Sequence, residues 1–106
     1  ATFIRYMNAI NDYLHQHPER RTAGGRLTST QLGIPGTDTV SHIISQQRVF
    51  VWATETPGLM AALREQSNDS ALLGRVENGR LLDTAGRALS VTLPSVIPDH
   101  VILWMN

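Results

Sequence analysis

The sequence predicts an α+β fold in which two principal helices pack on a mainly antiparallel sheet of four to five strands. Apolar residues recur at helical spacing in two segments, one starting near residue 3 and one after residue 56. The pair Asn78-Gly79 lies between two apolar segments, as in a tight hairpin. The segments 49–52 and 101–105 are apolar at every position, which is typical of interior strands. Residues 1–106 are expected to form a single globular domain.

The composition excludes several kinds of chemistry. The 106 residues are 42% hydrophobic and 17% charged, as in a soluble globular domain, and nine basic residues balance nine acidic ones. Every basic residue is an arginine and no cysteine is present, which excludes lysine Schiff bases, thiol catalysis, disulfides and cysteine-based zinc sites. With a formal charge of zero, the chain is not expected to have the broad positive surface that binds nucleic acid.

The first predicted helix covers about 15 residues. Its apolar face is Phe3, Met7, Ile10 and Leu14, at positions i, i+4, i+7 and i+11. Thr2 suits the cap position, and Pro18 ends the helix because the residue before a proline is pushed out of the helical region.

The segment from 19 to 45 is harder to assign. Residues 19–26 are arginine-rich and have no apolar period, so we expect an exposed connection. Thr28 and Gln31 have the spacing of a capping box, and Gly33 and Pro35 end that helix within a turn or two. A further short helix is expected to begin at a cap formed by Thr37 or Asp38 and to include the apolar residues Val40, Ile43 and Ile44.

A strand and the second principal helix follow. Residues 48–54 are predicted to form the strand. Thr56 is expected to cap the helix with Pro57 at its first position, Leu59, Met60 and Leu63 to be its buried residues, and Ser67, Asn68 and Asp69 to end it.

The remaining segments are predicted to be antiparallel strands. A two-residue turn at Asn78-Gly79 pairs Glu77 with Arg80 and Val76 with Leu81. Ala85 and Gly86 form the next turn, Leu89, Val91 and Leu93 alternate as in a half-buried strand, and residues 101–105 form an interior strand. The expected core is Val51, Trp52, Leu59, Leu63, Val76, Leu81, Val91, Leu103 and Trp104.

The sequence offers no catalytic, cofactor-binding or metal-binding constellation, and we expect no enzyme. His15 and His17 point about 200° apart on a helix and cannot share one metal. His42 follows Ser41 directly, but sequence neighbours do not form a nucleophile and its base. Glu55 and Glu65 would lie about 15 Å apart, too far for paired glycosidase carboxylates. The triplet 68–70 matches a glycosylation acceptor, which chance often produces.

A winged helix-turn-helix is the alternative that would bind DNA. Residues 27–35 and 38–44 would be its two helices, with Thr39, Ser41 and His42 facing the groove and the strand at residue 49 as the wing. Gly33, Pro35 and Gly36 make the turn longer and stiffer than in that motif, and only Arg26 and Arg48 lie near for phosphate contacts.

Taken in order, these segments resemble the PilM family of type IVB pilus systems, which serve thin conjugative and bundle-type pili. Three stretches carry the resemblance: the amphipathic helix leading into a proline at residues 3–18; the strand, helix and hairpin at residues 49–59 and 70–81; and the closing segment at residues 91–105, with Pro94 and Pro98 before the last strand. These are turn and packing residues, and they span most of the chain.

The resemblance implies a non-catalytic scaffold or docking domain of the pilus assembly machine. It implies one transmembrane helix before Ala1, anchoring the domain to the bacterial inner membrane with its soluble part in the periplasm. Its partners would be other pilus assembly proteins, or a second copy in a homo-oligomer, with no nucleic acid and no cofactor. The chain starts with alanine rather than methionine, as expected if that anchor precedes it.

Charged residues mark where a partner could dock. The candidates are Arg5 and Asp12 on the polar side of the first helix, and Arg20, Arg21 and Arg26 in the arginine-rich connection. A minor pilin or pseudopilin subunit is a related alternative, because it also places a long N-terminal helix against an antiparallel sheet. The type IVB pilins of that comparison carry a disulfide in their C-terminal half, and this chain has no cysteine.

Overall fold

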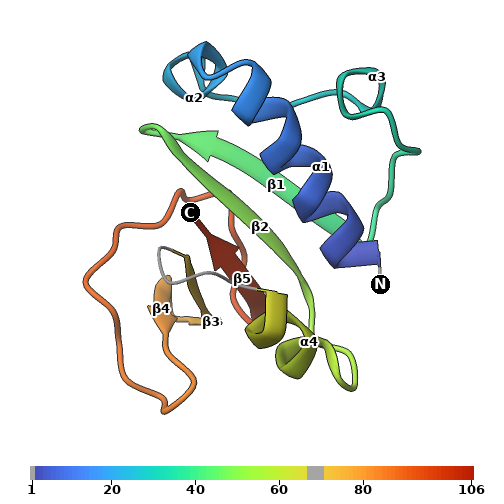
Figure 1. Ribbon diagram of the computed structural model, residues 1–106. Helices are drawn as coiled ribbons and strands as arrows, with labels where there is room; N and C mark the ends of the chain where they lie inside the picture. The colour runs from blue at the N-terminus through green and yellow to red at the C-terminus, as the bar shows by residue number, and fades with distance from the viewer. Residues whose placement is uncertain (1, 67–70) are drawn as a thin grey trace.

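The computed structural model describes residues 2–66 and 71–106 and confirms the α+β fold. The helices in this part of the chain are α1 (Thr2–Gln16), α2 (Glu19–Ala23), α3 (Ser29–Leu32) and α4 (Leu59–Gln66). The strands are β1 (Val40–Ser45), β2 (Arg48–Thr54), β3 (Leu72–Glu77), β4 (Arg80–Leu82) and β5 (Val101–Met105). They form one antiparallel sheet in the order β1-β2-β5-β3-β4, so the last strand of the chain is central (Figure 1).

Side chains alternate between the two faces of the sheet and build two cores. On one face α1 and α4 pack over Val49, Val51, Ile102 and Trp104. The other face is covered by the irregular segment 83–100, which places Leu89, Val91, Leu93 and Ile97 over the opposite side chains of β2 and β5. This explains why 49–52 and 101–105 are apolar throughout: each strand is buried on both faces.

Both sheet edges are shielded by irregular backbone, which limits edge-to-edge association. Gly25 exchanges two hydrogen bonds of 2.8 Å with Ile44 on the outer side of β1. On the opposite edge, the N–H of Leu89 donates to the carbonyl of Leu81 in β4 at 2.8 Å.

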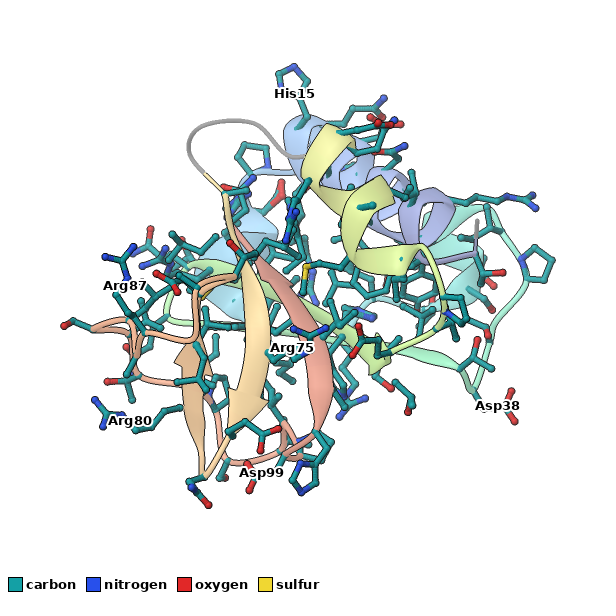
Figure 2. The ribbon with its side chains drawn as sticks, turned by 90° about the horizontal axis from the view of Figure 1, so that it is seen from below. His15, Asp38, Arg75, Arg80, Arg87 and Asp99 are labelled. Carbon is teal, nitrogen blue, oxygen red and sulfur yellow. The ribbon has the colours of Figure 1, made fainter. Side chains whose placement is uncertain are left out.

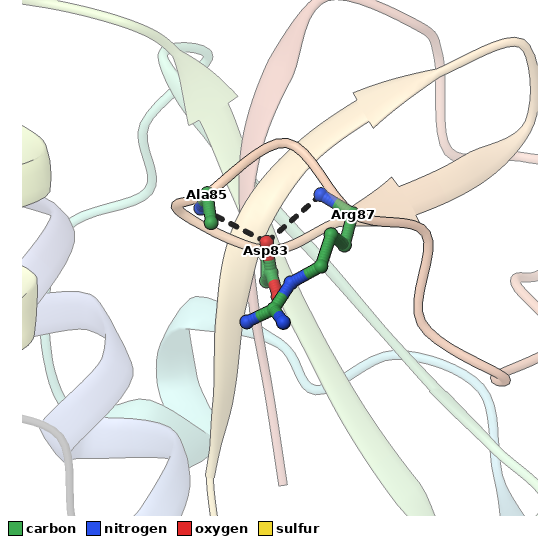
Figure 3. A network of polar contacts seen from close by, with 3 residues as sticks. All are labelled: Asp83, Ala85 and Arg87. Carbon is green, nitrogen blue, oxygen red and sulfur yellow. Dashed lines mark hydrogen bonds and ion pairs between the residues drawn. The ribbon is translucent and has the colours of Figure 1, made fainter.

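Gly74 in β3 lets the chain move from the sheet edge onto the second face. The carbonyl oxygen of Leu82 lies so close that a Cβ built on Gly74 would be 1.8 Å from it. Only glycine permits backbone to approach backbone in this way. Immediately after this crossing, Oδ1 of Asp83 accepts the N–H groups of Ala85 and Arg87, each at 2.9 Å, which fixes the predicted turn (Figure 3).

Several elements agree with the sequence predictions. α1 buries Phe3, Met7, Ile10 and Leu14, as its spacing predicted. The hairpin pairs Val76 with Leu81 and Glu77 with Arg80 around Asn78 and Gly79, whose φ values are 53° and 75°. Both tryptophans are buried, and the predicted core is confirmed except at Val91, which is half-buried. The predicted end of α4 at residues 67–69, and the triplet 68–70, lie outside the described residues.

The helix expected through Val40, Ile43 and Ile44 is wrong, because this segment is strand β1. Its burial alternates strictly, with Val40, His42 and Ile44 facing α1. The spacing 40, 43, 44 suits a helix only when His42 is counted as polar and exposed, whereas it is 3% exposed. Without a second helix, the helix-turn-helix alternative loses its recognition element.

Three further expectations are corrected. Residues 19–23 form the short helix α2 instead of an open connection, entered through Pro18 and ended at Gly24. α4 starts at Leu59 and not at Pro57, because Gly58 adopts a left-handed φ of 81°. Residues 89–93 alternate in hydrophobicity but form no strand. They pack across the second face of the sheet, on the side chains of strands whose backbones are already paired with one another.

Candidate functional site

The exposed face of α1 carries two of the predicted docking residues. Arg5 and Asp12 are both exposed and lie opposite the buried stripe of the helix. Asn8, between them on the same face, is also exposed. A shallow groove of about 420 Å³ runs beside this face, between α1 and α3, and includes both charged residues. Its lining is Arg5, Asn8, Ala9, Asp12, Tyr13, Gln16, Gln31, Leu32 and Ile34.

The far wall of this groove is held by the capping box that the sequence predicted. The N–H of Gln31 donates to Oγ1 of Thr28 at 3.1 Å, and the N–H of Thr28 donates to Oε1 of Gln31 at 2.8 Å. The amide nitrogen of Gln31 also donates to the hydroxyl of Tyr13 in α1 at 3.2 Å. One side chain therefore caps α3 and attaches it to α1, which gives the groove a fixed width.

The three arginines of the arginine-rich connection lie in different surroundings. Arg21 donates to the carbonyl oxygens of Gln47 at 3.1 Å and Asn106 at 3.3 Å, and so joins α2 to the β1–β2 turn and the end of β5. Arg20 is half-buried and reaches the carbonyl of Gly24 at 3.4 Å. Arg26 is exposed. Two of the three predicted docking arginines thus support the fold, and Arg26 is the one that faces solvent.

His42 is the buried polar residue of the described chain, at 3% exposure. Its Nε2 accepts the backbone N–H of Leu27 at 2.9 Å, so this nitrogen carries no proton. The proton of the neutral ring is then on Nδ1, which donates to the hydroxyl oxygen of Tyr6 at 3.2 Å. Burial, and to a smaller extent the positive charge of Arg26, lower the pKa of His42 from 6.5 to about 4.

This arrangement makes His42 a structural residue. The ring joins β1 to α1 through Tyr6 and to the segment after α2 through Leu27, and both nitrogens are occupied. Sequence reasoning considered His42 as a neighbour of Ser41 and as a groove-facing residue of the helix-turn-helix alternative. The signal that could have revealed its burial was the alternation of apolar residues at 40, 42 and 44, with histidine taking one interior place.

Some of the other charged groups form pairs at the surface. Arg75 and Glu55 form a two-bond ion pair, which lowers the pKa of the Glu55 carboxyl through hydrogen bonding. Glu77 accepts from Nδ1 of His100 at 3.0 Å, rather than pairing with Arg80 opposite it in the hairpin. In Figure 2, Arg80 and Asp99 lie at the opposite end of the molecule from His15. Residues 2–66 and 71–106 contain no cluster of three potential metal ligands.

His15 and His17, which the sequence places two residues apart, have different surroundings. α1 ends at Gln16, and the ring of His17 stacks on Tyr13 with centroids 4.3 Å apart. His15 is exposed and points outward from the helix end (Figure 2). Among the described helices, none combines the length and the apolar character needed to span a bilayer.

Comparison with known proteins identifies the family. The PilM family profile matches residues 1–105. The crystal structure of a PilM protein from Escherichia coli B7A is 78% identical and superposes with a TM-score of 0.87, over 99% of this chain and 85% of that one. A pilM protein from Pseudomonas aeruginosa 2192 is 20% identical, with a TM-score of 0.45 over 97% of this chain and 87% of that one. The curated proteins include no match. The profile match over nearly the whole chain shows that this pilus-related protein belongs to the PilM family.

Proposed function

We propose that this domain is a non-catalytic docking domain of a type IVB pilus assembly machine. It works in the periplasm, is attached to the inner membrane by a segment before Ala1, and binds other pilus assembly proteins. Membership of the PilM family supports the link to pilus assembly. The α1 face with Arg5 and Asp12, together with the exposed Arg26, is the surface offered to partners, a second copy of the chain among them.

The observation that carries the non-catalytic role is the position of His42. It is the histidine with a strongly shifted pKa, which is often a sign of a catalytic group. Here both of its ring nitrogens hold the fold together, and the groove beside α1 is lined by other residues. Its hydrogen bonds therefore serve packing, and this supports a function that is exerted through the surface of the domain.

A complementation experiment tests the role. A strain lacking the gene is expected to make no pili, and the wild-type gene is expected to restore them. His42→Gln keeps a neutral hydrogen-bonding side chain, so a folded H42Q protein should also restore pili. Loss of pili with a folded H42Q protein would instead support a chemical role for His42. Recovery of the chain within sheared pili would favour the minor pilin alternative.

Reporter fusions test the location. A C-terminal alkaline phosphatase fusion to the natural full-length protein should be active, because this reporter requires the oxidising periplasm for its disulfides. The same fusion to a cytoplasmic protein is the inactive control. An inactive but intact fusion would contradict the periplasmic location.

A further inference from the structure

The arrangement of charge on α1 is self-complementary. Arg5 and Asp12 are seven residues apart, which places them on the same side of the helix, about 20° apart around its axis and about 10 Å apart along it. At that separation they cannot form an ion pair with one another. Within residues 2–66 and 71–106 neither side chain has a hydrogen bond or ion pair.

We propose that this face binds a second copy of the chain, with the two α1 helices antiparallel across a two-fold axis. In that arrangement Arg5 of each copy lies opposite Asp12 of the other, so one contact repeats twice. A parallel arrangement would place like charges opposite each other, which is repulsive. The charge pattern thus selects both the partner and its orientation, and this inference does not rest on the proposed pilus function.

The helix itself does not explain this order of charges. The positive end of a helix dipole is at its N-terminus, where acidic side chains are stabilising. α1 has no acidic residue in its first turn and carries Arg5 there instead. An acidic residue at position 5 and a basic residue at position 12 would interact more favourably with the dipole of an isolated helix. The observed order therefore points to a requirement outside the helix.

The centre of the exposed α1 face, between Arg5 and Asp12, leaves room for the close approach of a second helix. The midpoint between residues 5 and 12 falls between Asn8 and Ala9, where the two-fold axis would pass. The small side chain of Ala9 allows close approach, and the Asn8 amide can both donate to and accept from its own copy. The groove between α1 and α3 adds Leu32 and Ile34 as apolar contacts beside the helix. With so narrow a face, the dimer should be weak, in the micromolar range.

Charge reversal tests the pairing on the 106-residue chain by sedimentation equilibrium at low salt. The wild type should reach twice 11.7 kDa with rising concentration. Arg5→Glu and Asp12→Arg should each weaken dimerisation about ten-fold or more, because each creates two like-charge contacts. The double variant R5E/D12R should restore it to within about three-fold of wild type. Arg80→Glu, on the distant strand β4, is the matched control and should have no effect (Figure 2).

Cross-linking tests the orientation separately, since the chain has no natural cysteine. Asn8→Cys should form a disulfide-linked dimer under mild oxidation, because residue 8 lies near the axis. Gln16→Cys, on the same face, would be about 22 Å from its copy in the antiparallel pair and should not cross-link. A chain that stays monomeric at about 0.5 mM would overturn the proposal and leave this face to a different protein. Failure of the double variant to restore dimers, or cross-linking through residue 16, would overturn it as well.

Discussion

The backbone N–H of Leu27 donates a hydrogen bond of 2.9 Å to Nε2 of His42, and this bond requires an unprotonated nitrogen. It connects the segment after α2 to the centre of edge strand β1. The same ring donates to Tyr6 in α1, so three parts of the chain meet at one neutral histidine. The consequence is a fold whose stability depends on pH.

Acid should destabilise the protein through His42. Its pKa is about 4 in the folded chain and near 6.5 when unfolded, so between these values only the unfolded chain takes up this proton. The free energy of unfolding is therefore unaffected by His42 above about pH 6.5, falls as the pH drops towards 4, and is lowered in total by about 3 kcal/mol. Urea unfolding followed by tryptophan fluorescence at several pH values measures it. His42→Gln should flatten the slope in this window, and parallel curves for the two proteins would contradict the prediction.

Gly74→Ala should be strongly destabilising. The added Cβ would collide with the Leu82 carbonyl, which is backbone and cannot rotate away. We expect a loss of about 3 kcal/mol in the free energy of unfolding, or failure to fold. Gly36→Ala is the matched control, because a Cβ there meets open space and its φ is not positive. Equal denaturation midpoints for the two variants would contradict the crossing at Gly74.

Gly79→Val should weaken the hairpin. Gly79 has a φ of 75°, where a β-branched side chain is strained, and the expected cost is about 1 to 2 kcal/mol. Gly79→Asn should cost less, because asparagine tolerates positive φ better. The unfolding midpoint in urea measures both variants. An unchanged midpoint for the valine variant would contradict the hairpin register.

Arg21→Ala should lower stability although the residue was predicted as a docking site. Losing its bonds to the carbonyls of Gln47 and Asn106 should cost about 1 kcal/mol. Arg26→Ala removes the same charge from an exposed position and should change stability by less than about 0.5 kcal/mol. Thermal unfolding at neutral pH compares the two. A larger effect from the Arg26 variant would reverse these roles.

The candidate docking surface could be predicted only in part. The polar side of α1 follows from its helical period, so Arg5 and Asp12 were found as exposed charges. The groove beside them could not be found, because it depends on where α3 packs. Arg20 and Arg21 looked equivalent to Arg26, since a sequence does not show which guanidinium meets a backbone carbonyl.

Local sequence patterns determine several elements of this protein without reference to tertiary packing. The helical stripe of α1, the positive-φ turn at Asn78-Gly79 and the doubly apolar strands β2 and β5 depend on neighbours in sequence, and all were predicted. Tertiary structure decided the remainder. Residues 40–45 became a strand because pairing with β2 and hydrogen bonds from Leu27 and to Tyr6 made it possible to bury His42. Residues 89–93 lie across the second sheet face and bury its apolar side chains, and they do not add a strand to the sheet edge. Tyr6, Leu27 and the side chains of the second sheet face are distant in sequence from the segments that they bury, so the local alternation in these segments did not by itself decide between helix, strand and cover.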